Sequence, residues 1–457
     1  MEIAPLLILL VGILTVVGMI VGFRINAFLA LITAAMVVSL LAPGAWEAKI
    51  ARVAVAFGNT TGSIGIVIAM AAVIGVTMMA SGAADRIVQA FLRLLGRERG
   101  GAVLTFSGFV LSVPVFFDTV FYLLVPLARS MYRQTGRTYL KYLMAITAGG
   151  VATHALVPPT PGPLVIADNL GIDLGVMMLV GVLVAFPAAT VGLLFSGWVD
   201  RRMPVPLRPL ADVDEAPPQE GRLPGLLASL MPIALPVVLI SAQTVIRPIA
   251  LNAGAASVWA QAGQWTAVFG NPNLALLLAA AVSVWLYVSN RKPTREKVAH
   301  LIGQSLMSGG LIILITAAGG AFGAMLKEAQ IGPAIEGMFA GTSQTSGLVM
   351  LTLGFGIASL LKFAQGSSTV AMITASAMLA AMVTPASLGF HPVYLGTAIG
   401  GGALVGSWMN DSGFWIYSKM GGLTEIETLK SWSPLLAVIG IVGVLMSFLL
   451  AWILPLI

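Results

Sequence analysis

The sequence predicts an all-α polytopic membrane protein built from two inverted-topology repeats. Of its 457 residues, 58% are hydrophobic and only 9% are charged, whereas a soluble domain carries about 25% charged residues. Two long apolar segments are interrupted by short polar runs. The Lys and Arg residues gather in the loops on one side of the expected spans. Together these observations predict paired halves, each with an interrupted (re-entrant) hairpin and a broken span.

Ten segments approach the length of about 20 apolar residues that crosses a bilayer. They cover residues 3–22, 25–42, 60–80, 141–159, 176–199, 226–246, 272–289, 301–326, 393–410 and 434–455. Two further segments, 102–130 and 347–384, are longer than one span and polar in the middle. We expect each of them to form an interrupted hairpin that begins and ends on one side of the membrane.

The basic residues assign a side to each loop. In this scheme 19 of the 24 Lys and Arg residues lie on one side, four lie on the other, and Lys362 alone lies in the membrane. The basic side holds the loops 85–99, 129–141, 200–222 and 291–297, with Arg24, Lys419 and Lys430. Because loops rich in Lys and Arg stay in the cytoplasm, we expect a multi-pass protein of the cell (inner) membrane with both termini outside.

A polar linker divides the chain into two similar halves. We expect an N-terminal repeat (1–199), a cytoplasmic linker (200–224) and a C-terminal repeat (225–457). Each half has three spans, an interrupted hairpin and two spans, and the basic loops give the halves opposite orientations. Residues 101–109 resemble 347–355, and both halves carry a glycine-rich run before the broken span end. Inverted repeats place substrate and coupling-ion sites between the halves, near the midplane.

The interruption of the second long segment predicts a binding site. Lys362 is the only basic residue of this segment, and an ammonium at bilayer depth is costly unless something compensates it. A run of short polar residues follows it: Gln365, Gly366, Ser367, Ser368 and Thr369. Such a run breaks a membrane helix and frees backbone groups. A cation beside free helix N-termini and hydroxyl groups suits a carboxylate that itself bears hydroxyls.

Asp118 marks the interruption of the first long segment. It is the only acid between residues 102 and 130. A medium of low dielectric favours the protonated carboxyl, so Asp118 could take up and release a proton near neutral pH. The alternative is a structural acid that caps the second arm of the hairpin.

A proline-rich run breaks the span at 141–159. Four prolines lie between residues 158 and 163 and cannot continue a helix. The break brings His154 and Thr160 next to free backbone groups. His154 could carry a proton, or a backbone carbonyl could satisfy it.

A second polar run, at 407–415, follows the corresponding span of the other half. It contains Asn410, Asp411 and Ser412. Asp411 could pair with Lys362, hold a cation or carry a proton, or it could cap the helix that follows.

A further polar run, at 57–63, precedes the third span and contains Asn59 and Thr60. It is either a solvated loop or part of the site. The interruptions at 115–119 and 361–369 occupy matching places in the two halves. We therefore expect both to line one central polar pocket, together with the broken span ends.

With these motifs the chain resembles the gluconate permease family, the GntP-type gluconate:proton symporters of the ion transporter superfamily. The resemblance covers nearly the whole chain. Its motifs lie at 57–65, 81–87, 116–118, 153–163, 364–371 and 410–415. It implies import of gluconate or a related hydroxy-monocarboxylate with protons, by a homodimer with a scaffold and a moving transport part.

Two positions depart from the family pattern. Thr160 stands where the family commonly has a histidine, and Lys362 stands where relatives often have an arginine. A lysine gives up bidentate recognition of a carboxylate. These departures leave room for a substrate different from that of the relatives.

We therefore predict a secondary active transporter. Its substrate-binding residues are Lys362, Gln365, Gly366, Ser367, Ser368, Thr369, Thr160, Asn59, Thr60, Asn410 and Ser412, and its proton-coupling residues are Asp118, His154 and Asp411. The alternatives are a sodium-coupled carboxylate symporter, a passive channel and an intramembrane enzyme. An enzyme is disfavoured because the sequence has no catalytic motif and no cysteine. We expect no cofactor, no bound metal and no nucleic-acid partner.

Overall fold

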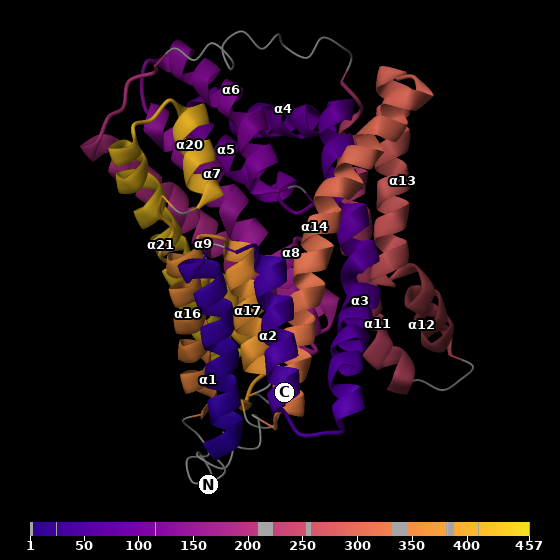
Figure 1. Cartoon of the computed structure of the whole chain (residues 1–457). Helices are drawn as coiled ribbons and strands as arrows, with labels where there is room; N and C mark the ends of the chain where they lie inside the picture. The colour runs from indigo at the N-terminus through magenta and orange to yellow at the C-terminus, as the bar shows by residue number, and fades with distance from the viewer. Residues whose placement is uncertain are drawn as a thin grey trace.

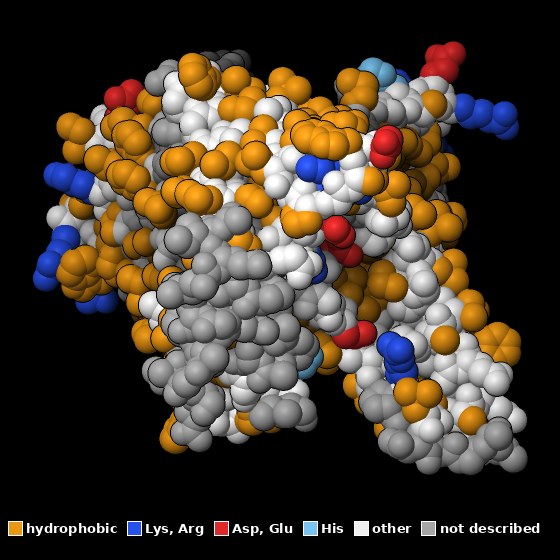
Figure 2. All heavy atoms as spheres, turned by 60° about the horizontal axis from the view of Figure 1, so that its bottom comes forward, with side chains coloured by type: hydrophobic (Ala, Val, Ile, Leu, Met, Phe, Trp, Pro, Cys, Tyr) orange, Lys and Arg blue, Asp and Glu red, His pale blue; other side chains and the backbone are white. Residues whose placement is uncertain are grey.

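A computed structural model of the chain describes residues 3–456, except for 24, 115, 209–222, 253–256, 331–345, 381, 383–387 and 410. Throughout this part of the chain the secondary structure is helical, without a strand. Seven of the described helices are long and apolar enough to cross a membrane. Hydrophobic side chains are spread over the face in Figure 2, where charged side chains are few and scattered. These findings confirm the predicted all-α membrane protein.

The helices of the first half run in order to the polar linker. They are α1 (Ile3–Val17), α2 (Ala27–Leu41), α3 (Trp46–Ser81), α4 (Ala83–Leu95), α5 (Gly100–Leu111), α6 (Phe117–Thr135), α7 (Tyr139–Leu156), α8 (Pro161–Leu170) and α9 (Leu174–Arg202). In Figure 1, α4, α5 and α6 lie at the upper end of the molecule, and α1 and α2 lie at the lower end.

The helices of the second half begin after the linker. They are α11 (Leu226–Asn252), α12 (Val258–Phe269), α13 (Pro272–Arg291), α14 (Arg295–Glu328), α16 (Ser346–Gln365), α17 (Ser368–Ala380), α19 (Val393–Gly402), α20 (Ser412–Gly421) and α21 (Glu425–Ile453). In Figure 1, α3 and α11 to α14 form one side of the molecule, while α16, α17 and α21 lie on the other. Both ends of the chain are at the lower end of this view.

Both long segments are interrupted near the predicted residues. The first is split into α5 and α6, and the second into α16 and α17, which contact each other. Gly366 has a φ of +88° at the second break, a backbone conformation that glycine adopts without steric cost. The proline-rich run separates α7 from α8.

One of the two alternatives for the run 57–63 and two expectations about the elements are wrong. The run 57–63 is not a loop, because α3 continues through it. The loop 85–99 contains the helix α4, and the expected span 393–410 ends at Gly402, before the separate helix α20. The hydroxyls of α3 do not break it because they bond to its own carbonyls, Thr61 to Phe57 and Ser63 to Thr60, both at 2.9 Å.

Glycines bring α7 and α19 close to their neighbours. A Cβ added to Gly149 of α7 would collide with the backbone of Thr105 in α5. A Cβ added to Gly402 of α19 would collide with the backbone of Phe355 in α16. Backbone contact of this kind needs small residues at the interface. Each glycine thus fixes a broken span against the first arm of the hairpin in its own half.

Candidate functional site

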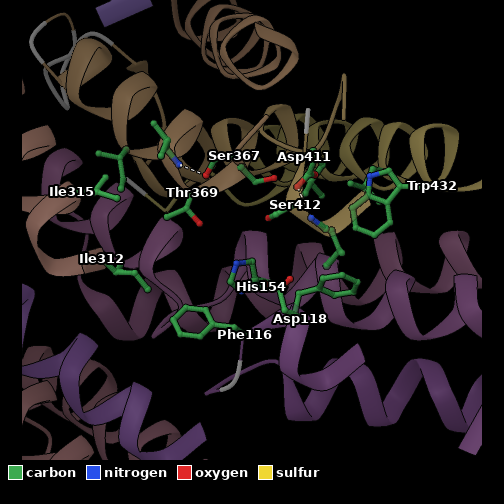
Figure 3. Close-up of a pocket in the computed structure, with 18 of the residues that line it drawn as sticks. Phe116, Asp118, His154, Ile312, Ile315, Ser367, Thr369, Asp411, Ser412 and Trp432 are labelled. Atoms are coloured by element: carbon green, nitrogen blue, oxygen red, sulfur yellow. Dashed lines mark hydrogen bonds between the residues drawn. The ribbon is translucent and has the colours of Figure 1, made fainter. Parts of the chain in front are cut away.

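A cavity of about 490 Å³ lies where the interrupted segments meet. Its polar wall comes from the first residues of α6, α17 and α20. His154 of α7 joins this wall, and residues of α14 and α21 complete the lining. In Figure 3, Ser367, Thr369, Asp411 and Ser412 lie above the cavity, while Phe116, Asp118 and His154 lie below it.

Three helix N-termini face this cavity. The helices α6, α17 and α20 begin at Phe117, Ser368 and Ser412, and all three residues line it. The first backbone N–H groups of a helix have no partner within the helix, and the helix dipole gives this end a partial positive charge. The convergence of three such ends makes the cavity suited to an anion.

Two titratable side chains lie on the lower wall. Asp118 is in the first turn of α6, and no side-chain hydrogen bond caps that helix. The N-cap residue is Phe116, and a carboxylate in the first turn suits the helix dipole, so both roles considered for Asp118 stay predictions. His154 lines the cavity, and its Nδ1 is buried with no hydrogen-bond partner in the described part of the chain. Phe116 packs edge-on against the imidazole, with ring centroids 6.0 Å apart.

Lys362 lies behind the cavity wall rather than in it. Its side chain is fully buried, and its Nζ donates to Asp411 Oδ2 and to the carbonyl of Gly366, both at 2.5 Å. Asp411 lines the cavity and caps α20, since its Oδ1 accepts from the backbone N–H of Gly413 at 2.9 Å. Of the roles considered for Asp411, pairing with Lys362 and capping a helix are both present.

The ion pair extends into a hydrogen-bonded chain. Ser407 Oγ donates to Asp411 Oδ2 at 2.5 Å, and Trp432 Nε1 donates to Ser407 Oγ at 2.7 Å. Trp432 of α21 also lines the cavity and packs against Phe117, with ring centroids 5.5 Å apart. Trp432 was not among the predicted site residues, because its neighbours in the chain carry no signal of a site.

Apolar side chains form the remaining wall. Leu311, Ile312 and Ile315 of α14 and Leu436 of α21 line the cavity. These residues were read only as parts of spans, since no local pattern separates a cavity-facing Ile from a lipid-facing one. The cavity therefore has one polar and one apolar side, which suits an amphiphilic organic anion more than a bare inorganic one.

Several predicted site residues lie elsewhere. The Thr160 hydroxyl donates to the carbonyl of Val157 at 2.6 Å, and Thr160 lines a separate small cavity that also contacts Phe116. Asn59 is exposed on α3, and Thr60 is buried beside Gly320 of α14. Neither of them lines the central cavity. The side chain of Gln365 and all of Asn410 lie outside the described residues.

Comparison with protein families decides what kind of protein carries this site. The model of the GntP family permease matches residues 4–453. The chain belongs to the GntP permease family. This permease is therefore a membrane transporter and not an enzyme, as the sequence predicted.

The permease has relatives of similar length that are named as transporters or permeases. It is 32% identical to a gluconate permease of Pseudomonas aeruginosa over 452 residues, which cover 98% of both chains. It is 30% identical to a low-affinity gluconate transporter of Escherichia coli K12 over 440 residues, 96% of both chains. A Gnt-II system L-idonate transporter of the same bacterium is 28% identical over 454 residues, 96% of the permease and 98% of the relative.

Two solved transporters share the fold at low sequence identity. MtrF of Neisseria gonorrhoeae, described as one of a class of antimetabolite efflux pumps, superposes with a TM-score of 0.63. The two chains are 13% identical, and 94% of the permease and 95% of MtrF are covered. The YdaH transporter of Alcanivorax borkumensis has a TM-score of 0.58 at 15% identity, over 94% of the permease and 98% of that chain. These likenesses support the fold alone.

Proposed function

We propose that the permease imports gluconate or a related hydroxy-monocarboxylate together with protons. The observation that carries the proposal is the convergence of three helix N-termini and several hydroxyls on one cavity. Its volume, about 490 Å³, lies within the range of small-molecule sites, about 300–1,000 Å³. Relatives named for gluconate and L-idonate supply the substrate class.

The substrate carboxylate binds at the N-termini of α17 and α20, in this proposal. First-turn backbone N–H groups donate to the carboxylate there, beside those already bonded to Ser367 and Asp411. The hydroxyls of Ser368, Thr369 and Ser412 then bond to the substrate hydroxyls. Trp432 and the α14 side chains pack against its carbon chain.

Asp118 and His154 carry the coupled proton. Both line the cavity, so a proton on either one faces the bound anion directly. Protonation adds positive charge next to the carboxylate and so strengthens its binding. Asp411 is held by Lys362 and Ser407, which makes it a less accessible proton carrier than Asp118.

Lys362 acts as a positioning residue in this proposal. It joins the break of the second hairpin, through the Gly366 carbonyl, to the start of α20, through Asp411. Both of those elements present N-termini to the cavity. Its contribution to binding is therefore the placement of these two elements rather than a contact with the substrate.

Two inverted repeats, 1–199 and 225–457, surround the site in this proposal, with the linker 200–224 and the basic loops in the cytoplasm. The similar packing of Gly149 on α5 and Gly402 on α16 supports the repeat. Rocking of a transport part against a scaffold then exposes the cavity to each side in turn. A homodimer, as the resemblance to the superfamily implies, supplies a fixed scaffold for this motion.

Transport by reconstituted protein tests the coupling. Proteoliposomes that contain the purified permease are given radiolabelled gluconate with an inward proton gradient, an inward sodium gradient or neither. Accumulation above the equilibrium level with the proton gradient alone supports the proposal. Accumulation that requires sodium at fixed pH supports the sodium-coupled alternative, and mere equilibration indicates a passive channel.

A further inference from the structure

A second cavity of about 490 Å³ lies at the upper end of the molecule, between α4 and α11. Apolar side chains form most of its lining, with Ile87 and Phe91 on α4 and Leu226 and Leu230 on α11. Two cations, Arg86 and Arg93, stand on the same helix and line the same groove. None of these residues lines the cavity where the interrupted segments meet.

The orientation of α4 places the groove at the membrane surface. In Figure 1, α4 crosses the upper end of the molecule and is steeply inclined to the long helices α3 and α13. The helix is amphipathic, with Ile87 and Val88 buried and Gln89 and Arg93 exposed. Amphipathic helices of this kind lie in the interface plane, with cations at the level of lipid headgroups.

One of the two cations has an unsatisfied nitrogen. Arg86 Nε is buried and has no hydrogen-bond partner in the described part of the chain. The charge of the neighbouring carboxylate, Asp85, interacts with Arg291 of α13. A buried, unpaired guanidinium nitrogen is costly unless an anion approaches it. The groove therefore combines two guanidinium groups, one of them with an unsatisfied nitrogen, with an apolar floor.

Stacked aromatic rings support the apolar floor of the groove. The ring of Phe91 stacks on Phe106 at 6.3 Å between centroids, and Phe106 stacks on Phe186 at 5.9 Å. Beside the groove, Leu94 and Leu227 are each 77% exposed. They continue the apolar surface outward, as expected where acyl chains cover a protein.

We infer that this groove binds a phospholipid with an anionic headgroup. Its phosphate bonds to Arg86 and Arg93, and one acyl chain lies between α4 and α11 along Phe91 and Leu230. A free phosphate would leave the apolar floor exposed, and a zwitterionic lipid would bring a cation of its own beside the two guanidinium groups. Basic sites between membrane helices recognise anionic lipids in this way. The inference does not depend on the substrate or on the coupled ion.

Lipid titration of the full-length permease tests the site. Native mass spectrometry of the detergent-purified protein measures binding of dioleoylphosphatidylglycerol and dioleoylphosphatidylcholine. We expect one tight site for the anionic lipid in the wild type, weakened about 30-fold in R86Q/R93Q, since each interfacial cation contributes about fivefold. The control R137Q/R295Q removes two exposed arginines from loops of the predicted basic side and should leave this site unchanged.

Two further measurements separate the components of the site. Ala90→Trp fills the groove without changing the charge and should weaken the anionic lipid at least tenfold. Glycerol 3-phosphate, a headgroup without chains, should not compete at millimolar concentration. The inference is overturned if the wild type binds both lipids equally, if R137Q/R295Q loses as much affinity as R86Q/R93Q, or if glycerol 3-phosphate displaces the lipid. If R86Q/R93Q does not fold, three measurements still test the site. They are the binding of the two lipids to the wild type, the effect of Ala90→Trp, and the competition with glycerol 3-phosphate.

Discussion

The ammonium of Lys362 lies 2.5 Å from Asp411 Oδ2, and the Lys362 side chain is 0% exposed. The two residues lie 49 positions apart in the chain, at the end of α16 and immediately before α20. Because Lys362 is fully buried and Asp411 largely so, each charge is tolerated through the presence of the other. The pair therefore joins the second hairpin break to the broken span end beside the cavity.

Removal of one partner should destabilise the permease more than removal of both. Lys362→Met or Asp411→Asn alone disrupts a buried ion pair, with an expected cost of about 3–5 kcal/mol. The double variant leaves no unpaired charge and should recover at least half of that loss. Unfolding of the four proteins in detergent, compared as a double-mutant cycle, measures the coupling.

The same double variant separates positioning from direct recognition. If Lys362 only positions the break, the folded double variant should bind gluconate within about tenfold of the wild-type affinity. Complete loss of binding by a double variant that melts like the wild type would show that Lys362 contacts the substrate. Additive destabilisation in the cycle would contradict the tight pair itself.

Asp118→Asn should uncouple transport from the proton gradient. The amide cannot take up and release a proton, but it keeps the size and polarity of the carboxyl in the first turn of α6. We expect proton-driven accumulation of gluconate to be lost while counterflow exchange stays within about threefold of the wild type. Glu47→Gln, at an exposed acid in the first turn of α3, is the control that should keep both activities. Full accumulation by Asp118→Asn would exclude Asp118 as the proton carrier.

Thr369 and Thr160 should respond differently to the same substitution. Thr369 lines the central cavity, so Thr369→Val removes a hydroxyl that bonds to the substrate and should raise KM about tenfold. The Thr160 hydroxyl is bonded to Val157 within the chain. Thr160→Val should therefore lower thermal stability and change KM less than about twofold. Initial uptake rates over a range of gluconate concentrations give the KM of each variant. A larger rise in KM for Thr160→Val than for Thr369→Val would contradict this prediction.

The sequence located the two interruptions because their signals are local. A lone carboxylate at 118 and a glycine with hydroxyls at 366–369 stand out from apolar surroundings, and the structure breaks its helices there. The same reasoning offered a loop as one of two alternatives for the polar run at 57–63, and that alternative is wrong. Its hydroxyls bond to carbonyls one turn earlier, so polarity alone did not predict a break there.

Other features depend on contacts that no local pattern encodes. The amphipathic helix α4 is too polar to register as a span, and its groove exists only because α11 packs beside it. Trp432 and Ile315 face the cavity because of how α21 and α14 are rotated in the packed structure. The pairing of Lys362 with Asp411 was open among several alternatives, since residues 49 positions apart meet only through tertiary packing.

Cysteine labelling should place the two ends of the molecule on opposite sides of the membrane. The chain contains no cysteine, so Ala45→Cys before α3 and Thr294→Cys before α14 each introduce a single thiol at an exposed position. The asymmetry of basic residues predicts Thr294 inside and Ala45 outside. A membrane-impermeant maleimide applied to intact cells should label Ala45→Cys alone, and both variants should react after permeabilisation. Labelling of Thr294→Cys in intact cells would reverse the proposed topology.

Gly149→Ala should be among the more destabilising single-methyl additions in the permease. The new Cβ would collide with the backbone of Thr105, which cannot move without shifting α5, and overpacking of this kind costs about 1–3 kcal/mol.

Gly356→Ala is the matched control, because a Cβ on this glycine of α16 meets nothing within 4 Å. There the loss of backbone freedom in the unfolded chain should stabilise the helix by up to about 1 kcal/mol. Melting of the two purified variants measures both effects, and equal melting temperatures would contradict the close contact of α7 with α5. If the contact is as described, the shift of α5 should also disturb the neighbouring break at Asp118 and lower the uptake rate of Gly149→Ala alone.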